Sequence, residues 1–203
     1  MKNYGDKLKI WEAAALAALS FTLLLACWAQ GRQGSISSEL VRLHVIAVSD
    51  TEQEQRIKLQ VRDAVLEYLK PKFRNISSPE AAERIIEENM SGIKKAAEAA
   101  ARGRAVKAEL GREAYPTREY LGFSLPAGKY ESLRITLGEG KGHNWWCIVF
   151  PPLCLDAAQA QQVESVMSRE DYALVSETQG YELRFKLLEL WGSFSNAMDD
   201  ALT

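Results

Sequence analysis

The side chains that could take part in catalysis are few, and most of them stand in one short stretch. His143 and Cys147 belong to the segment GHNWWC, and His44 is the other histidine of the chain. A cysteine nucleophile needs a base within hydrogen-bond reach. On an extended strand His143 and Cys147 would lie roughly 13 Å apart, so they cannot form a dyad with each other. His44 could approach Cys147 only across a sheet, and nothing in the sequence requires this pairing.

Motifs for metal ions and phosphate groups are missing from the sequence. It contains no HExxH, no CxxC and no paired Cys/His spacing, which are the usual signatures of zinc sites. The glycine-rich loop Gly138–Gly142 lacks the Gly-Lys-Ser/Thr ending of a phosphate-binding loop, and it joins two expected strands instead of a strand and a helix. We therefore expect no catalytic residue, no metal site and no cofactor.

The two cysteines in the body of the chain have a structural explanation. Cys147 and Cys154 are the cysteines that follow the apolar N-terminus, and the prolines at 151 and 152 could fold the chain back between them. In an exported protein this arrangement favours a disulfide, which would contribute about 2–3 kcal/mol for so short a loop. Two buried free thiols are the alternative.

The tandem tryptophans allow two interpretations. On a strand Trp145 and Trp146 point to opposite faces. In the first interpretation one indole is core and the other is exposed beside His143 and Asn144, where it forms part of a contact for a protein partner. In the second interpretation both indoles are core, because the sheet is packed on both faces.

Composition and charge limit the kinds of partner. The chain has 203 residues, of which 47% are hydrophobic and 26% are charged, and its formal net charge is -2 at pH 7. Nucleic-acid binding needs a concentrated basic surface, so this balance argues against a nucleic-acid partner. A chain of this length can bury the core of one ordinary domain.

The N-terminus has the pattern of an export signal. Lysines at positions 2, 7 and 9 precede an uncharged, apolar run from Ala13 to Ala29, and a polar segment follows. Three fates are open: cleavage after Ala29, cleavage and lipidation at Cys27, or retention as an anchor that contacts the membrane. In each case we expect the rest of the chain to lie outside the cytoplasm.

Periodicity and composition divide the chain into four regions. We expect a signal peptide or membrane anchor over 1–29 and a polar linker over 30–38. A core domain over 39–155 follows, and then a C-terminal extension with a terminal amphipathic element over 156–203.

The core domain is predicted to have an α+β fold. One helix is expected after the capping residues Ser49 and Asp50 and ends before Pro71, and a second helix is expected from Ser78 to Gly103. Alternating residues predict strands at 41–47, 106–110 and 132–137, and the apolar run 145–150 predicts another. A turn and a further short strand are expected within 115–125. The sequence thus predicts an N-terminal strand and two helices packed on a mainly antiparallel sheet in a single domain.

Two long segments of the chain resemble the stage II sporulation protein R family. They are VRLHVIAVSDTEQEQRIKLQVRDAVLEYL, from Val41, and YPTREYLGFSLPAGKYESLRITLGEGKGHNWWCIVFPPLC, from Tyr115. The pattern NWWC-x3-PPLC is highly specific, because two tryptophans, two cysteines and two prolines rarely coincide at fixed spacing. Val48 stands where the best-known form of the family has asparagine before Ser49-Asp50.

This resemblance implies a role in signalling between cells. Proteins of this family are made in the forespore of endospore-forming bacteria and are exported into the space between forespore and mother cell. There they activate a membrane-embedded aspartic protease of the mother cell, which processes an inactive sigma factor precursor of the sigma-E type. The resemblance therefore leads us to expect an exported protease activator with no catalysis of its own.

Two other functions stay open at this point. An extracytoplasmic thiol hydrolase or cell-wall enzyme would use Cys147 as its nucleophile. A lipid-anchored binding module would carry its lipid on Cys27.

Overall fold

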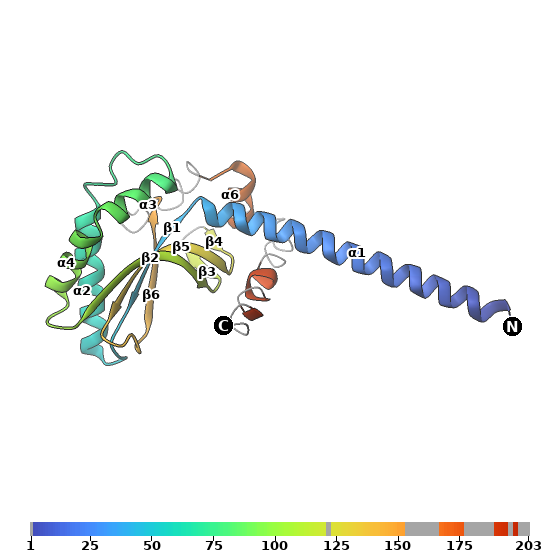
Figure 1. Cartoon of the computed structure of the whole chain (residues 1–203), viewed down its shortest axis with the longest axis horizontal. Coiled ribbons are helices and arrows are strands. Elements are labelled where there is room, and N and C mark those ends of the chain that lie inside the picture. Colours follow the sequence, from blue (N-terminus) through green and yellow to red (C-terminus); the bar gives the residue numbers. More distant parts are fainter. Residues whose placement is uncertain (1, 121–122, 153–166, 177–188, 195–196, 199–203) are drawn as a thin grey trace.

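A four-stranded mixed sheet lies at the centre of the domain (Figure 1). The computed structural model describes residues 2–120, 123–152, 167–176, 189–194 and 197–198. In the order β2-β5-β1-β6, the strands of the sheet are β2 (Val106–Tyr115), β5 (Gly128–Leu137), β1 (Val41–Ile46) and β6 (Asn144–Phe150). β1 runs parallel to β5, whereas the other two pairs are antiparallel. The expected α+β fold is confirmed.

Three helices cover one face of this sheet, which we call the helix face. They are α2 (Glu52–Leu69), α3 (Pro79–Glu88) and α4 (Met90–Ala100). Alternate side chains of β1 and β5 point into the core on this face: Val41, Leu43, Val45, Leu133, Ile135 and Leu137. They share one core cluster with Ile57, Val61 and Val65, which recur at helical spacing along α2. The period-two and helical patterns of the sequence therefore meet in one core.

The start of α2 differs from the prediction. Its N-cap is Thr51, whose Oγ1 accepts a hydrogen bond from the backbone N–H of Glu54, and the acidic first turn complements the helix dipole. The prediction that Ser49 and Asp50 cap this helix is wrong. Asp50 instead accepts a hydrogen bond from the backbone N–H of His143, so it joins the start of α2 to the loop before β6.

The prediction of one continuous second helix is also wrong, because the helix is divided into α3 and α4 at Asn89. The Asn89 side chain donates from Nδ2 to the carbonyl of Ile85 (2.8 Å) and accepts from the hydroxyl of Tyr68 on α2 (3.2 Å). A Cβ at Gly92 would overlap the Tyr68 ring, so α4 passes very close to that side chain. The break therefore accommodates Tyr68, a contact that helical periodicity does not reveal.

The opposite face of the sheet, which we call the far face, is also covered. The covering elements are the end of α1 (Lys2–Ser38), the hairpin of β3 (Arg118–Tyr120) and β4 (Phe123–Leu125), and α6 (Arg169–Val175). A second core cluster lies here, formed by Ala29, Ile36, Leu40, Tyr115, Phe123, Leu125, Tyr130, Ile148, Met167 and Val175. The sheet is therefore packed on both faces.

The segment expected as a polar linker, 30–38, is the last part of α1. Ile36 is fully buried there. The polar side chains of the segment bind α6: Arg32 pairs with Asp171 (3.4 Å), and the Ser35 hydroxyl donates to Asp171 Oδ2 at 2.6 Å. The polarity of this segment thus reflects contacts with residues far along the chain and not the solvent exposure of a linker.

The C-terminal extension expected over 156–203 is described in part. It contains α6 and helical residues at 189–194 and 197–198, where an amphipathic element was expected. The other residues of this region, and Cys154 before it, lie outside the described residues.

The close approach of two loops provides a test of this packing. A Cβ at Gly142 would overlap the backbone carbonyl of Ser49, whereas a Cβ at Gly111 meets nothing within 4 Å. We expect Gly142→Ala to lower the free energy of unfolding by roughly 1–3 kcal/mol, because the backbone of a loop must shift. Gly111→Ala should change it by less than about 0.5 kcal/mol. Urea denaturation measures both, and equal effects would contradict the contact with Ser49.

Candidate functional site

Arg42 is a buried cation on the far face of the sheet, with 0% of its surface exposed. Its guanidinium carbon lies 3.8 Å from the ring centroid of Tyr115 and 4.9 Å from that of Tyr130. Nη2 donates to the hydroxyl of Tyr120 at 2.7 Å, while Nε and Nη1 have no hydrogen-bond partner within the described structure. Burying a cation without a carboxylate partner is costly, and the two aromatic faces offset part of this cost.

Two of the tyrosines around Arg42, Tyr115 and Tyr130, are held in their neutral form. Burial raises the pKa of the hydroxyl groups of Tyr115 and Tyr130. The Tyr115 hydroxyl lies 2.6 Å from Ser132 Oγ, and the Tyr130 hydroxyl donates to the carbonyl of Pro126 at 2.6 Å. These bonds fix both rings around the guanidinium group and leave neither hydroxyl as a base at neutral pH.

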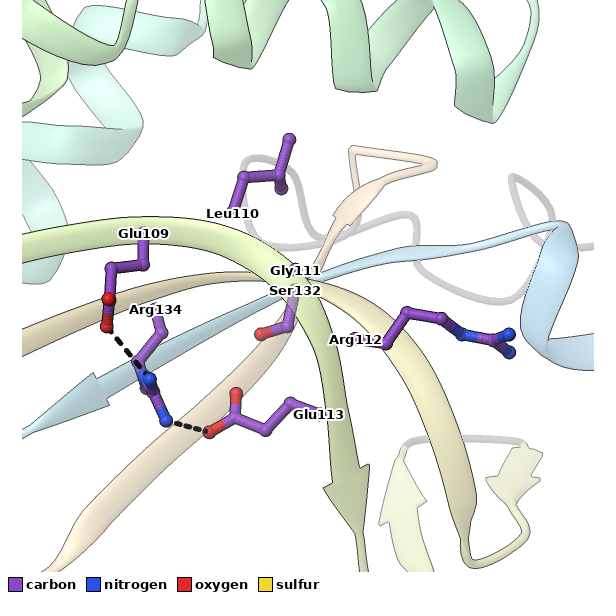
Figure 2. A pocket seen from close by; sticks show the side chains of 7 residues that line it. All are labelled: Glu109, Leu110, Gly111, Arg112, Glu113, Ser132 and Arg134. Atoms are coloured by element: carbon purple, nitrogen blue, oxygen red, sulfur yellow. Dashed lines mark hydrogen bonds and ion pairs between the residues drawn. The ribbon is translucent and has the colours of Figure 1, made fainter.

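Four ionisable side chains lie beside this cluster, and we call them the charged row: His44, Glu113, Arg134 and Glu109. His44 on β1 is opposite Arg134 on β5, which in turn is opposite Glu109 on β2. Glu113 Oε1 lies 2.9 Å from His44 Nδ1 and 3.5 Å from Arg134 Nη1, and Arg134 Nη2 lies 2.8 Å from Glu109 Oε2. Figure 2 shows Arg134 between the two carboxylates. The row thus links three neighbouring strands through their side chains.

Two opposing effects act on the carboxyl group of Glu113. Burial favours its neutral form, but the hydrogen bond and the charge of His44, together with Arg134, outweigh burial, so its pKa lies below the ordinary value. Glu113 is therefore ionised at neutral pH, and it holds the His44 ring beside Trp146 at a centroid distance of 5.4 Å. The second oxygen of Glu113 has no hydrogen-bond partner in the described structure.

The charged row borders an open hollow of about 160 Å³ on β2 and β5. Its lining residues are Glu109, Leu110, Gly111, Arg112, Glu113, Ser132 and Arg134. In Figure 2 the side chains of Glu109, Glu113 and Arg134 lie on one side of β2, whereas Leu110 points toward the helices on the other side. The described residues contain no group of three or more His, Cys, Asp or Glu that could hold a metal ion.

A histidine paired with a carboxylate could act as a general base if a nucleophile lay within reach. The Nε2 atom of His44 has no hydrogen-bond partner in the described structure. Cys147 is opposite Leu43 in the ladder between β1 and β6, so it points to the helix face, while His44 points to the far face. The pairing of His44 with Cys147 that the sequence left open is therefore not formed.

The predicted contact residues stand at the start of β6. The side chain of His143 is 76% exposed and its Nδ1 lies 2.5 Å from Asp50 Oδ1; Asn144 is also exposed. Trp145 and Trp146 point to opposite faces, as the sequence predicts: they are opposite Val45 and His44, respectively.

Both indoles of this pair are half-buried and are flanked by arginines. Trp145 packs against the core of the helix face with Arg62 4.8 Å from its ring centroid. Trp146 packs against the core of the far face, and the guanidinium carbon of Arg118 lies 3.8 Å from its ring centroid. The structure thus combines the two interpretations: each indole packs on a core, and each is also partly exposed.

Cys147 is 8% exposed and is disulfide-bonded. Cys154, its predicted partner, lies outside the described residues, so the pairing of these two cysteines stays a prediction. Cys27 is an exposed free cysteine on α1.

Sequence reasoning missed Arg42, Glu113 and Arg134. Arg42 and His44 alternate with apolar residues, a pattern that is typical of a strand with one solvated face. Glu113 and Arg134 become neighbours only through the register of β2 with β5. The one available signal was the number of tyrosines between 115 and 130, which could have suggested an aromatic environment for a buried cation.

Two comparisons with known proteins confirm the resemblance noted from the sequence. The family described as stage II sporulation protein R (spore_II_R) matches residues 37–160. Stage II sporulation protein R of Bacillus subtilis (strain 168) is 36% identical over 140 residues, which are 66% of this chain and 62% of that protein. The match thus spans less than two thirds of the relative's length. No solved structure is significantly similar to the chain.

The charged row predicts how stability depends on pH. The lowered pKa of Glu113 means that its carboxylate stabilises the fold above the ordinary pKa and loses this effect as pH falls through the folded value. We expect Glu113→Gln to lower the free energy of unfolding by roughly 1–3 kcal/mol at pH 7. The difference in free energy of unfolding between this variant and the unsubstituted protein should become smaller below about pH 4.5.

Urea denaturation at several pH values measures this difference. Glu139→Gln is the matched control, because the Glu139 side chain is 74% exposed and pairs with the equally exposed Lys141. Glu139→Gln should leave the free energy of unfolding nearly unchanged at every pH. A cost of Glu113→Gln that is the same at pH 7 and pH 3.5 would show that the charge of Glu113 is not what stabilises the fold.

Proposed function

The chain belongs to the stage II sporulation protein R family, and from this membership we propose that it is an exported signalling protein of sporulation. In this proposal it acts in the space between forespore and mother cell, where it activates a membrane aspartic protease. The protease then processes a sigma factor precursor of the sigma-E type in the mother cell. Family membership is the observation that carries this proposal.

The N-terminal helix supports export. The segment Lys9–Ser38 of α1 is long and apolar enough to cross a membrane, and its most apolar window is not buried by the domain. Leu16, Leu23 and Leu24 are among its exposed side chains. Exposed leucines on a helix that begins with lysines are typical of a signal or an anchor, and both keep the following domain on the outer side of the membrane.

The arrangement of the polar side chains favours binding over thiol catalysis. His143 pairs with Asp50 on the exposed loop, and His44 pairs with Glu113 on the far face, so each described histidine has a carboxylate partner. Cys147 points to the other face. An activator needs only to bind the active arrangement of the protease, such as a dimer, more tightly than the resting one.

The start of β6 is the surface that we assign to the protease. His143 and Asn144 are exposed, follow a glycine-rich loop and precede the partly exposed Trp145 and Trp146 in the chain. Aromatic edges next to exposed polar groups are common at the centres of protein interfaces. Both indoles also pack on a core, so the test of this surface uses the two polar residues.

The first test of the proposed function is co-expression in one bacterial host. The chain, the candidate protease and the sigma factor precursor are produced together, and processing is followed by immunoblot. We expect processing only when all three are present. Replacing Leu23, Leu24 and Leu25 by aspartate should abolish it, because each charge in an apolar segment costs about 2.5–3.5 kcal/mol and blocks export. Equal processing with this variant would contradict activation from outside the cytoplasm.

The second test concerns the contact surface. We expect the double variant His143→Ala, Asn144→Ala to lower activation about tenfold, as loss of an interface centre does. Its free energy of unfolding should fall by less than about 1 kcal/mol, because the pair of His143 with Asp50 is exposed. Lys94→Ala is the control, since it breaks an exposed ion pair with Glu98 on α4. Equal activation by both variants would place the contact elsewhere.

A further inference from the structure

The apolar span of α1 continues into the domain without a break. α1 is helical to Ser38, and its last turns are part of the second core cluster through Ala29 and Ile36. Arg32 and Ser35 bind Asp171 of α6 on the same stretch. The direction in which α1 leaves the domain is therefore set by packing and by hydrogen bonds.

The tryptophans of α1 indicate where a membrane would end. Trp11 and Trp28 are 17 residues apart, which corresponds to about 26 Å of helix. This length is close to the roughly 30 Å of a bilayer's hydrocarbon core, and tryptophan prefers its two interfaces. Trp11 is exposed, whereas Trp28 is partly buried against the second core cluster. The membrane surface would thus lie at Trp28, next to the domain.

A second apolar segment lies at the same end of the domain. A Cβ at Gly192 would overlap the backbone of Ala127, so the C-terminal helical residues 189–194 pack on the turn before β5. A Cβ at the following residue, Gly128, which begins β5, would overlap the side chain of Gln33 on α1. The turn is therefore held between α1 and the C-terminal segment, which Figure 1 shows in red at the end of the domain where α1 emerges.

This C-terminal segment carries an exposed apolar stripe. Leu190 and Phe194 are 67% and 58% exposed, and their spacing of four residues places them on one side of the helical residues 189–194. Met198 is also exposed, at 48%. Gly192 is buried toward the domain, whereas Ser193 is exposed and points about 100° around the helix from Phe194. Large apolar side chains in such a row are expected to be covered by a partner or a membrane.

We propose that this stripe rests in the interface of the bilayer that α1 enters. Gln33, which contacts the same turn, is five residues or about 8 Å beyond Trp28 along α1. An amphipathic helix buries its apolar face about 5–10 Å into the boundary between headgroups and acyl chains, so the stripe is within reach of lipid. The domain is then held against the membrane at two points. This contact does not depend on activation of a protease.

Photocrosslinking in the full chain tests the contact. The chain is reconstituted into phosphatidylcholine vesicles with p-benzoylphenylalanine at one position at a time: Phe194→p-benzoylphenylalanine in the stripe, or Ser193→p-benzoylphenylalanine outside it. A third sample carries the same group in place of Leu16, which reports that α1 is inserted. We expect lipid adducts at positions 16 and 194 and only background at position 193.

Each other outcome would overturn the proposal. With an adduct at position 16, the absence of an adduct at 194 would mean that the stripe is away from the bilayer. Equal lipid labelling at 193 and 194 would mean that the C-terminal segment meets lipid without presenting the stripe to it. An adduct of position 194 with a second copy of the chain would identify a protein partner for the stripe. A supporting result is checked in the variant Leu190→Glu with the crosslinker at 194, where the lipid adduct should be lost.

Discussion

The organisation of the domain depends on the burial of β1 on both faces. Val41, Leu43 and Val45 point to the helix face, and Arg42 and His44 point to the far face, where both are nearly inaccessible to water. An arginine and a histidine cannot be left without partners in such a place, since unpaired polar groups cost several kcal/mol. The far face must therefore supply tyrosines and a carboxylate at fixed positions.

The partners of these two side chains come from all parts of the far face. The β2 strand supplies Tyr115 and Glu113, β5 supplies Tyr130, and the β3–β4 hairpin supplies Tyr120. The end of α1 and α6 close the same core cluster over them. A one-residue change in the register of β2 with β5 would move Glu113 to the other face, because side chains alternate along a strand. The polar cluster thus makes this register of β2 with β5 more stable than its alternatives.

Much of the helix face was predictable from the sequence, because its signals are local. The cap at Ser78 and the alternation at 41–47 involve residues within one element. The far face was less predictable, because its signals come from distant parts of the chain. The polar segment with Arg32 has the composition of a solvated linker, but its partner Asp171 lies 139 residues further along the chain. The parallel pairing of β1 with β5 joins positions about 90 residues apart, and no local pattern reveals it.

The course of β1 shows that the membrane contact near α1 and the contact loop with His143 lie at opposite ends of the sheet. β1 begins at Val41, just after α1, and ends at Ile46, which is opposite Asn144 at the start of β6. Five residues of strand correspond to about 17 Å, so the exposed loop with His143 lies at the end of the sheet away from α1. An anchor at one end and a binding loop at the other would hold the loop away from the membrane that α1 enters. Under the proposed function, this arrangement lets the loop reach a protease in the opposite membrane.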